Sequence, residues 1–130
     1  MAALRYSFDH VHVYCTDIHA SERWFVDLLD ARVTERRGSP AAPTVALDLG
    51  GVTVLLRPRL AGESLGPPGP ARFGSDHMGL RVESVPDAVA QLRARGAVIS
   101  SGPRELRPGV FVAFVQGPDQ VRVELLSRPA

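Results

Sequence analysis

Three side chains in this sequence have the types and the relative positions that would bind a divalent metal ion: His10, His77 and Glu124. The pair Asp9-His10 recurs as Asp76-His77, and each pair is followed by a strand-like and then a helix-like segment. Two imidazoles and one carboxylate leave coordination positions open, as in non-haem Fe(II) oxygenases, and the same donors also bind Mn, Co, Ni or Zn. We therefore predict one divalent metal ion per site, and the donor types alone do not select among these metals.

The prediction depends on an internal repeat, because a single histidine or glutamate on a strand is more often a hydrogen-bonded structural residue than a ligand. Aligning the two Asp-His pairs also aligns V-T-V-L-L at 52–56 with V-R-V-E-L at 121–125, so that Leu55 corresponds to Glu124. Two curved units packed side by side would bring equivalent strand positions, including both histidines, to a common cavity. A buried carboxylate in an apolar strand also needs a cation nearby.

The elements that must position these residues follow the order β-α-β-β-β in both halves. In the first half, apolar residues at helical spacing predict a helix over 18–30 with an N-cap at Thr16-Asp17. We expect strands flanking it at 8–14 and 32–35, a loop at 38–43, and a hairpin that turns at Gly50-Gly51. In the second half, we expect a strand at 76–82 and a helix with Pro86 in its first turn and Gly96 at its end. Three strands follow at 98–99, 109–116 and 121–127.

These elements predict an α+β fold in which two tandem βαβββ modules form an open, cup-shaped mixed sheet. The expected domain organisation is one domain over 1–130, with module one at about 6–57, a Gly- and Pro-rich linker at 58–74, and module two at about 75–127. A hydrophobic content of 45% is sufficient for one shared core.

Composition restricts the partners. A net charge of +1 gives no basic excess for nucleic acid, and no uncharged run is long enough to span a bilayer. The single cysteine, Cys15, excludes an intrachain disulfide and suits a reducing compartment. The N-terminal residues contain no apolar segment of signal-peptide length. We expect a soluble, cytoplasmic protein that binds a small-molecule substrate and neither nucleic acid nor membrane.

The motifs resemble the vicinal oxygen chelate superfamily, which includes glyoxalase I, methylmalonyl-CoA epimerase, extradiol dioxygenases, fosfomycin-resistance transferases and bleomycin-resistance proteins. The resemblance covers nearly the whole chain. The family's H-x-x-L-x-V is similar to H-M-G-L-R-V at 77–82, and its closing F-x-D-P-D-G-x-x-I-E-L is similar to F-V-Q-G-P-D-Q-V-R-V-E-L at 114–125. The second motif places the family's carboxylate ligand on Glu124. The resemblance also implies a homodimer.

Two departures from the family pattern bear on the reaction. Glyoxalase I and the epimerase have a fourth ligand where this chain has Leu55, whereas extradiol dioxygenases and fosfomycin transferases use three. Both three-ligand groups usually carry Tyr where this chain has Phe114. Within the resemblance, the ligand count favours a dioxygenase-like enzyme acting on a molecule that chelates the metal through neighbouring oxygens. Fe²⁺ is then the favoured metal, with Mn²⁺, Ni²⁺, Co²⁺ or Zn²⁺ as alternatives. A metal-dependent lyase, isomerase or thiol transferase is the first alternative, and a non-catalytic antibiotic-binding resistance protein is the second.

Further candidates share the strand faces of the ligands. His12 and Tyr14 are the candidate catalytic residues, because an imidazole near the metal can shuttle protons; a structural hydrogen bond is the alternative for His12. The candidate substrate-binding residues are an aromatic side chain and three arginines that could bind a carboxylate or phosphate, unless they lie in solvent: Phe114, Arg57, Arg81 and Arg122.

Overall fold

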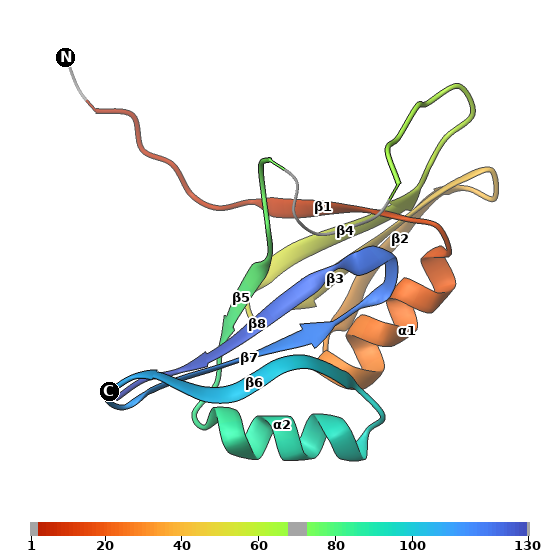
Figure 1. Ribbon diagram of the computed structural model, residues 1–130. Helices are drawn as coiled ribbons and strands as arrows, with labels where there is room; N and C mark the ends of the chain where they lie inside the picture. The colour runs from red at the N-terminus through yellow and green to blue at the C-terminus, as the bar shows by residue number, and fades with distance from the viewer. Residues whose placement is uncertain (1–2, 68–72, 130) are drawn as a thin grey trace. The chain divides into compact units, whose positions relative to one another are not determined.

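The computed structural model describes residues 3–67 and 73–129, and the chain separates into two compact units, 1–63 and 64–130. The first unit contains β1 (His10–Cys15), α1 (Ile18–Leu29), β2 (Arg32–Ser39), β3 (Ala42–Leu49) and β4 (Val52–Pro58). Its strands form one sheet in the order β1-β4-β3-β2, in which β1 runs parallel to β4 and the other neighbours are antiparallel (Figure 1).

The second unit repeats this arrangement. It contains β5 (Met78–Arg81), α2 (Val85–Ala94), β6 (Val98–Arg107), β7 (Val110–Gln116), a short 3₁₀ turn (Pro118–Gln120) and β8 (Arg122–Ser127). The sheet order is β5-β8-β7-β6, again with one parallel pair, β5 and β8. The predicted α+β class, with two tandem βαβββ modules and open mixed sheets, is confirmed.

Each helix covers one face of its own sheet. α1 begins at the predicted Asp17, whose carboxylate accepts from the backbone N–H groups of His19 at 3.0 Å and Ala20 at 3.1 Å. It contacts β3 and β4, and Phe25 on the helix and Leu47 on β3 are both buried. α2 begins after Ser84, whose hydroxyl accepts from the backbone N–H of Asp87.

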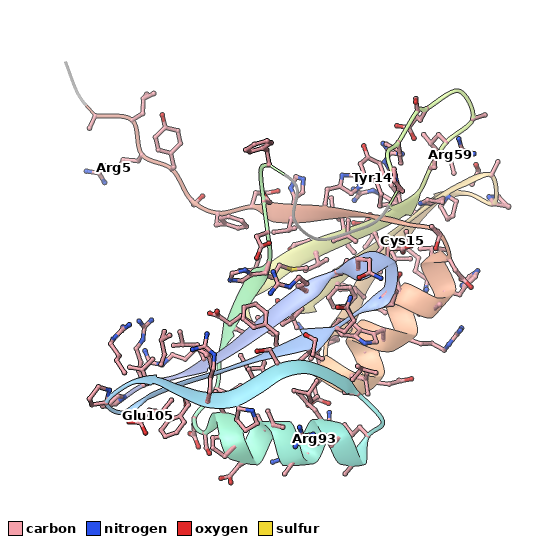
Figure 2. All side chains as sticks on the ribbon, in the orientation of Figure 1. Arg5, Tyr14, Cys15, Arg59, Arg93 and Glu105 are labelled. Atoms are coloured by element: carbon pink, nitrogen blue, oxygen red, sulfur yellow. The ribbon has the colours of Figure 1, made fainter. Side chains whose placement is uncertain are left out.

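Strand alternation leaves the opposite face of each sheet for polar chemistry. On β4, Val54 and Leu56 are buried, whereas the alternate residues are only partly covered. β8 has the same pattern, with Val123 and Leu125 buried and Glu124 between them. The same alternation on β1 leaves 43% of Tyr14 exposed but only 3% of the adjacent Cys15 (Figure 2). The predicted site residues that lie on these strands, including His12 and Glu124, therefore belong to the sheet faces that the helices do not cover.

Strand pairing supports the repeat alignment drawn from the sequence. In the parallel ladder of the first unit, His12 pairs with Leu55. In the parallel ladder of the second, Gly79 pairs with Glu124. His12 and Gly79 each come two residues after the aligned histidine of their unit, so Leu55 and Glu124 occupy equivalent positions. The first unit thus has the alkyl side chain of Leu55 where the second unit has the carboxylate of Glu124.

Several element boundaries differ from the sequence prediction. β2 continues to Ser39 and β3 starts at Ala42, so the loop expected at 38–43 is only a short turn. β6 extends over ten residues instead of two. Both are edge strands whose exposed side chains show no apolar alternation, and pairing with the next strand maintains them. β5 begins only at Met78, so Asp76 and His77 lie just before it.

The remaining boundaries agree closely, and Gly50 and Gly51 have positive φ values, as the expected hairpin turn requires. Residues 58–74 form no further helix or strand where they are described; positions 68–72 of this predicted linker lie outside the described residues. No helix among the described residues is both long and apolar enough to cross a membrane.

Candidate functional site

The second unit brings two of the predicted ligands together. Nε2 of His77 lies 3.7 Å from a carboxylate oxygen of Glu124, and both side chains are partly exposed, at 32% and 21%. A single ion bound at about 2.0–2.2 Å to each atom could bridge donors up to about 4.2 Å apart. The separation therefore fits two donors of one metal ion.

The carboxylate of Asp76 fixes the ring of His77. Its Oδ2 lies 2.8 Å from His77 Nδ1, and Arg122 Nη1 donates to the same oxygen at 2.5 Å. The hydrogen bond to His77 and the positive charge of Arg122 lower the pKa of Asp76, so this carboxylate is ionised. An ionised carboxylate only accepts hydrogen bonds, so in the neutral form of the ring Nδ1 carries the proton and Nε2 has the lone pair that a metal would use.

Phe114 and Arg122 complete the surroundings of His77. The Phe114 ring meets His77 edge to face, with centroids 5.1 Å apart, and the Arg122 guanidinium lies 4.4 Å from the centre of the Phe114 ring. Phe114 also pairs with Glu124 across β7 and β8. The described contacts of Arg122 are with Asp76 and Phe114, so it supports the histidine through these neighbours; its predicted role in binding a substrate anion stays a prediction.

The first unit repeats the Asp-His arrangement. Oδ2 of Asp9 lies 2.6 Å from Nδ1 of His10, which again leaves Nε2 as the available ring nitrogen. The ring of His12 follows at 6.2 Å from that of His10, and Tyr14 stacks on His12 at 5.7 Å. Three rings thus form a row along one face of β1.

His12 has an unusual environment for a histidine on an open sheet face. Partial burial, and then the positive charge of Arg57, lower the pKa of His12. The ring is therefore neutral near pH 7 and has a nitrogen that can accept a proton. This protonation state suits a proton shuttle, which stays a prediction.

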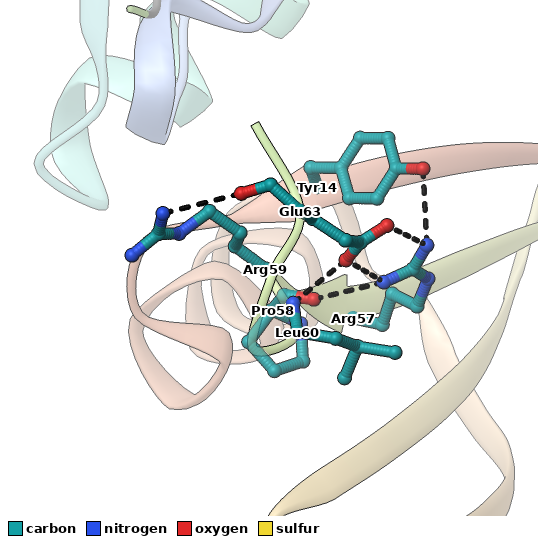
Figure 3. Close-up of polar contacts among 6 residues, drawn as sticks. All are labelled: Tyr14, Arg57, Pro58, Arg59, Leu60 and Glu63. Carbon is teal, nitrogen blue, oxygen red and sulfur yellow. Dashed lines mark hydrogen bonds and ion pairs between the residues drawn. The ribbon is translucent and has the colours of Figure 1, made fainter. Parts of the chain in front are cut away.

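Arg57 and Tyr14 belong to a polar cluster that includes a residue the sequence reasoning missed, Glu63 (Figure 3). Arg57 donates to both carboxylate oxygens of Glu63, at 2.8 and 3.0 Å, and to the hydroxyl of Tyr14 at 3.0 Å. The backbone N–H of Leu60 donates to Glu63 at 2.7 Å. The bond from Arg57, followed by that from Leu60, lowers the pKa of Glu63 to about 2.

Arg81 lies elsewhere in the second unit. It lines an open hollow of about 450 Å³ together with Val82, Glu83 and Arg128, and one of its nitrogens lies 3.5 Å from the carbonyl oxygen of Arg128. Its contacts do not join those of His77 and Glu124. A role in substrate binding stays a prediction for this residue.

Neither unit alone contains a complete metal site among its described residues. No group of three or more His, Cys, Asp or Glu side chains in the described ranges is arranged to hold a metal ion. The predicted triad draws His10 from the first unit and His77 and Glu124 from the second. Its assembly stays a prediction.

Comparison with known proteins identifies the family. Residues 7–125 match the model of the Glyoxalase/Bleomycin resistance protein/Dioxygenase superfamily. The chain belongs to this superfamily. No curated protein matches it significantly.

Solved structures of the superfamily confirm the fold. A glyoxylase/bleomycin resistance protein/dioxygenase domain from Frankia sp. EAN1pec is 24% identical, with a TM-score of 0.73 over 98% of this chain and 100% of that one. The fosfomycin resistance protein FosX from Listeria monocytogenes, solved with Mn(II) and sulfate, is 12% identical, with a TM-score of 0.71 over 97% and 95% of the two chains. TnmS3, an antibiotic-binding protein from Streptomyces sp. CB03234, is 16% identical, with a TM-score of 0.73 over 99% and 100%. At these identities the superfamily neighbours establish the architecture, and the reaction must be argued from the site.

Proposed function

We propose that this protein is a divalent-metal-dependent, dioxygenase-like enzyme whose substrate chelates the metal through neighbouring oxygens. The ligands would be His10, His77 and Glu124. The observation that carries the proposal is that the preceding aspartate contacts Nδ1 of both histidines, so that Nε2 is the ring nitrogen that would bind a metal in each. The short distance between His77 and Glu124 supports the same interpretation. The manganese in the FosX structure is consistent with a metal site on this fold.

The ion would be Fe²⁺ in preference to Mn²⁺, Ni²⁺, Co²⁺ or Zn²⁺, because three side-chain ligands with open positions are the arrangement of non-haem iron oxygenases. A bound metal would supply Lewis-acid polarisation of the chelating oxygens and, if redox-active, a place for O₂. We further propose that the protein is a homodimer, which the resemblance to the superfamily supports. We propose that it is cytoplasmic, which the single cysteine, Cys15, supports.

The chain's own residues would prepare the substrate. Asp9 and Asp76 would keep the imidazoles in one tautomer, and Phe114 packs edge to face with His77. His12, neutral because its pKa is lowered, would accept a proton from a substrate hydroxyl at its free ring nitrogen. Leu55, at the position equivalent to Glu124, adds no donor, so substrate and O₂ could bind together.

The proposal is tested by purifying the protein anaerobically, measuring its metal content, and following O₂ uptake with a panel of catechols. Iron with catechol-dependent O₂ consumption is the expected result. Turnover that persists under argon would instead support the lyase, isomerase or transferase alternative. Tight drug binding by the metal-free protein, without turnover, would support antibiotic sequestration, the activity named for TnmS3.

The ligand set is tested separately. His10→Ala and Glu124→Ala should each lose stoichiometric metal while retaining the native circular dichroism spectrum, because both side chains are partly exposed and contribute little to the core. His19→Ala, which removes a histidine from the exposed surface of α1, is the matched control and should keep its metal. One metal ion per chain in either ligand variant would reject the triad.

A further inference from the structure

The contact between Arg57 and Glu63 has the geometry of a bound carboxylate. Two guanidinium nitrogens donate to two carboxylate oxygens, at 2.8 and 3.0 Å, and this parallel, bidentate pairing is the one by which arginine recognises carboxylates in ligands. The Arg57 guanidinium lies 4.5 Å from the centre of the Tyr14 ring and donates to the Tyr14 hydroxyl. That hydroxyl thus accepts one bond and keeps its own proton to donate.

Arg57 lies on the same sheet face as the candidate ligand and the candidate proton shuttle of the first unit. Arg57 pairs with Tyr14 across β4 and β1, on the sheet face that also carries His10 and His12. Tyr14 is four residues after His10 on β1, which corresponds to roughly 13 Å along a strand. A ligand that chelates a metal at His10 would therefore meet Arg57 with a group at its far end, and His12 would lie between the two points.

The Arg57–Glu63 pair differs from the other bidentate pair in the same unit. Arg36 and Glu22 join β2 to α1, so both side chains come from elements that the core holds in place. Glu63 instead belongs to the segment that follows β4, where the described residues form neither strand nor helix. Its carboxylate accepts hydrogen bonds from the side chain of Arg57 and from the backbone N–H of Leu60. The side chains of Glu63 and Arg57 remain partly exposed, at 29% and 19%, so the pair is not sealed from solvent.

We propose that Arg57 and Tyr14 form a subsite for a carboxylate group of the substrate, and that Glu63 fills this subsite until the substrate displaces it. The assignment to a substrate rests on the proposed function, whereas binding of a carboxylate to Arg57 does not require a metal. The substrate class is a small organic acid whose carboxylate lies at the opposite end of the molecule from its chelating oxygens. Glu63 would lower the affinity of every such acid, because an attached carboxylate competes at a high effective concentration.

The test uses metal-free protein labelled with ¹⁵N-arginine and benzoate, an aromatic monocarboxylate, as the probe. The side-chain Nε–H signal of Arg57 is followed during the titration. In Glu63→Gln, which keeps the size of the side chain but removes its charge, the apparent Kd for benzoate should be at least about tenfold lower than in the wild type. Neutral benzamide should shift the signal in neither protein.

Two further variants make the result specific. Glu22→Gln frees Arg36 from an equivalent pair and should leave the benzoate affinity at Arg57 unchanged. Arg57→Lys in the Glu63→Gln background keeps the positive charge but loses the two parallel donors of the guanidinium. Its affinity for benzoate should return to the wild-type value or fall below it. Binding to this variant is followed on the ring signals of Tyr14 next to the hydroxyl, because the Arg57 signal is absent. Equal affinity of wild type and Glu63→Gln, or an Arg57 signal that benzoate does not move in Glu63→Gln, would overturn the proposal.

Failure of this proposal is distinguishable from failure of the proposed function. If Glu63→Gln gains no affinity for benzoate while the wild type binds metal and consumes O₂ with catechols, the carboxylate subsite alone is rejected. If Glu63→Gln binds benzoate more tightly but the wild type binds no metal, the subsite stands and the metalloenzyme is rejected.

Discussion

Asp76→Ala removes the group that fixes the ring of His77, and its effect on metal affinity can be worked out from the contacts. The carboxylate holds Nδ1 of His77 at 2.8 Å, and loss of such an outer partner typically lowers metal affinity about 10- to 100-fold. Asp76 is half exposed, and water can replace part of its role. We therefore expect the low end of that range, a decrease of about tenfold, or about 1.4 kcal/mol.

The assay is calorimetric titration of the metal-free protein with Mn²⁺, combined with ¹⁵N spectra of the His77 ring. In the wild type the proton should reside on Nδ1, and in Asp76→Ala a population with the proton on Nε2 should appear. Asp76→Asn separates the hydrogen bond that orients the ring from the negative charge, because an amide oxygen still accepts from Nδ1. This variant should retain most of the Mn²⁺ affinity. Asp48→Ala, which removes a carboxylate 3.9 Å from Arg32, is the control. Equal Mn²⁺ affinity in Asp76→Ala and the wild type would refute the assigned role.

Three other variants test separate parts of the molecule. Leu55→Glu should tighten metal binding but weaken any reaction that needs substrate and O₂ together; an unchanged or lower affinity in a folded protein would mean that Leu55 does not face the metal. His12→Ala should keep the metal and lose turnover, and an unchanged rate would leave His12 a structural residue. Ser127→Ala should reduce the free energy of unfolding by about 1–3 kcal/mol in a denaturant titration, because the buried Ser127 hydroxyl accepts from the backbone N–H of Val85 at the start of α2. A loss well below that range would show that water replaces this bond.

The architecture was predictable from the sequence because local and long-range signals agree in both halves. The N-cap Asp17 and the apolar period after it defined α1, and Gly50-Gly51 defined the β3–β4 turn. The repeat alignment, which uses the amino-acid sequence only, is supported by the pairing of His12 with Leu55 and of Gly79 with Glu124. The edge strands were underestimated because their side chains are exposed on both faces and carry no period of two.

The polar contacts of the candidate site were less accessible to sequence reasoning. Asp9 and Asp76 were used to align the halves, but their bonds to the adjacent histidines depend on side-chain rotamers that a pattern does not specify. Glu63 was missed because it lies in a Gly- and Pro-rich stretch without periodicity. The signal that could have found it is an acidic residue close in sequence to Arg57, which is a frequent and unspecific pattern.

The bond between Arg57 and Glu63 also restricts how the length of this chain can change during evolution. Side chains alternate along β1 and β4, so insertion of one residue within either strand would exchange the faces of the residues beyond it, and those of the site would turn to the helix-covered face. The segment that follows β4 would ordinarily tolerate insertions, but a residue added between Arg57 and Glu63 would move the carboxylate away from the guanidinium. Homologues that keep both residues should therefore vary in length only after Glu63, and those that have lost Glu63 should be free to vary directly after β4.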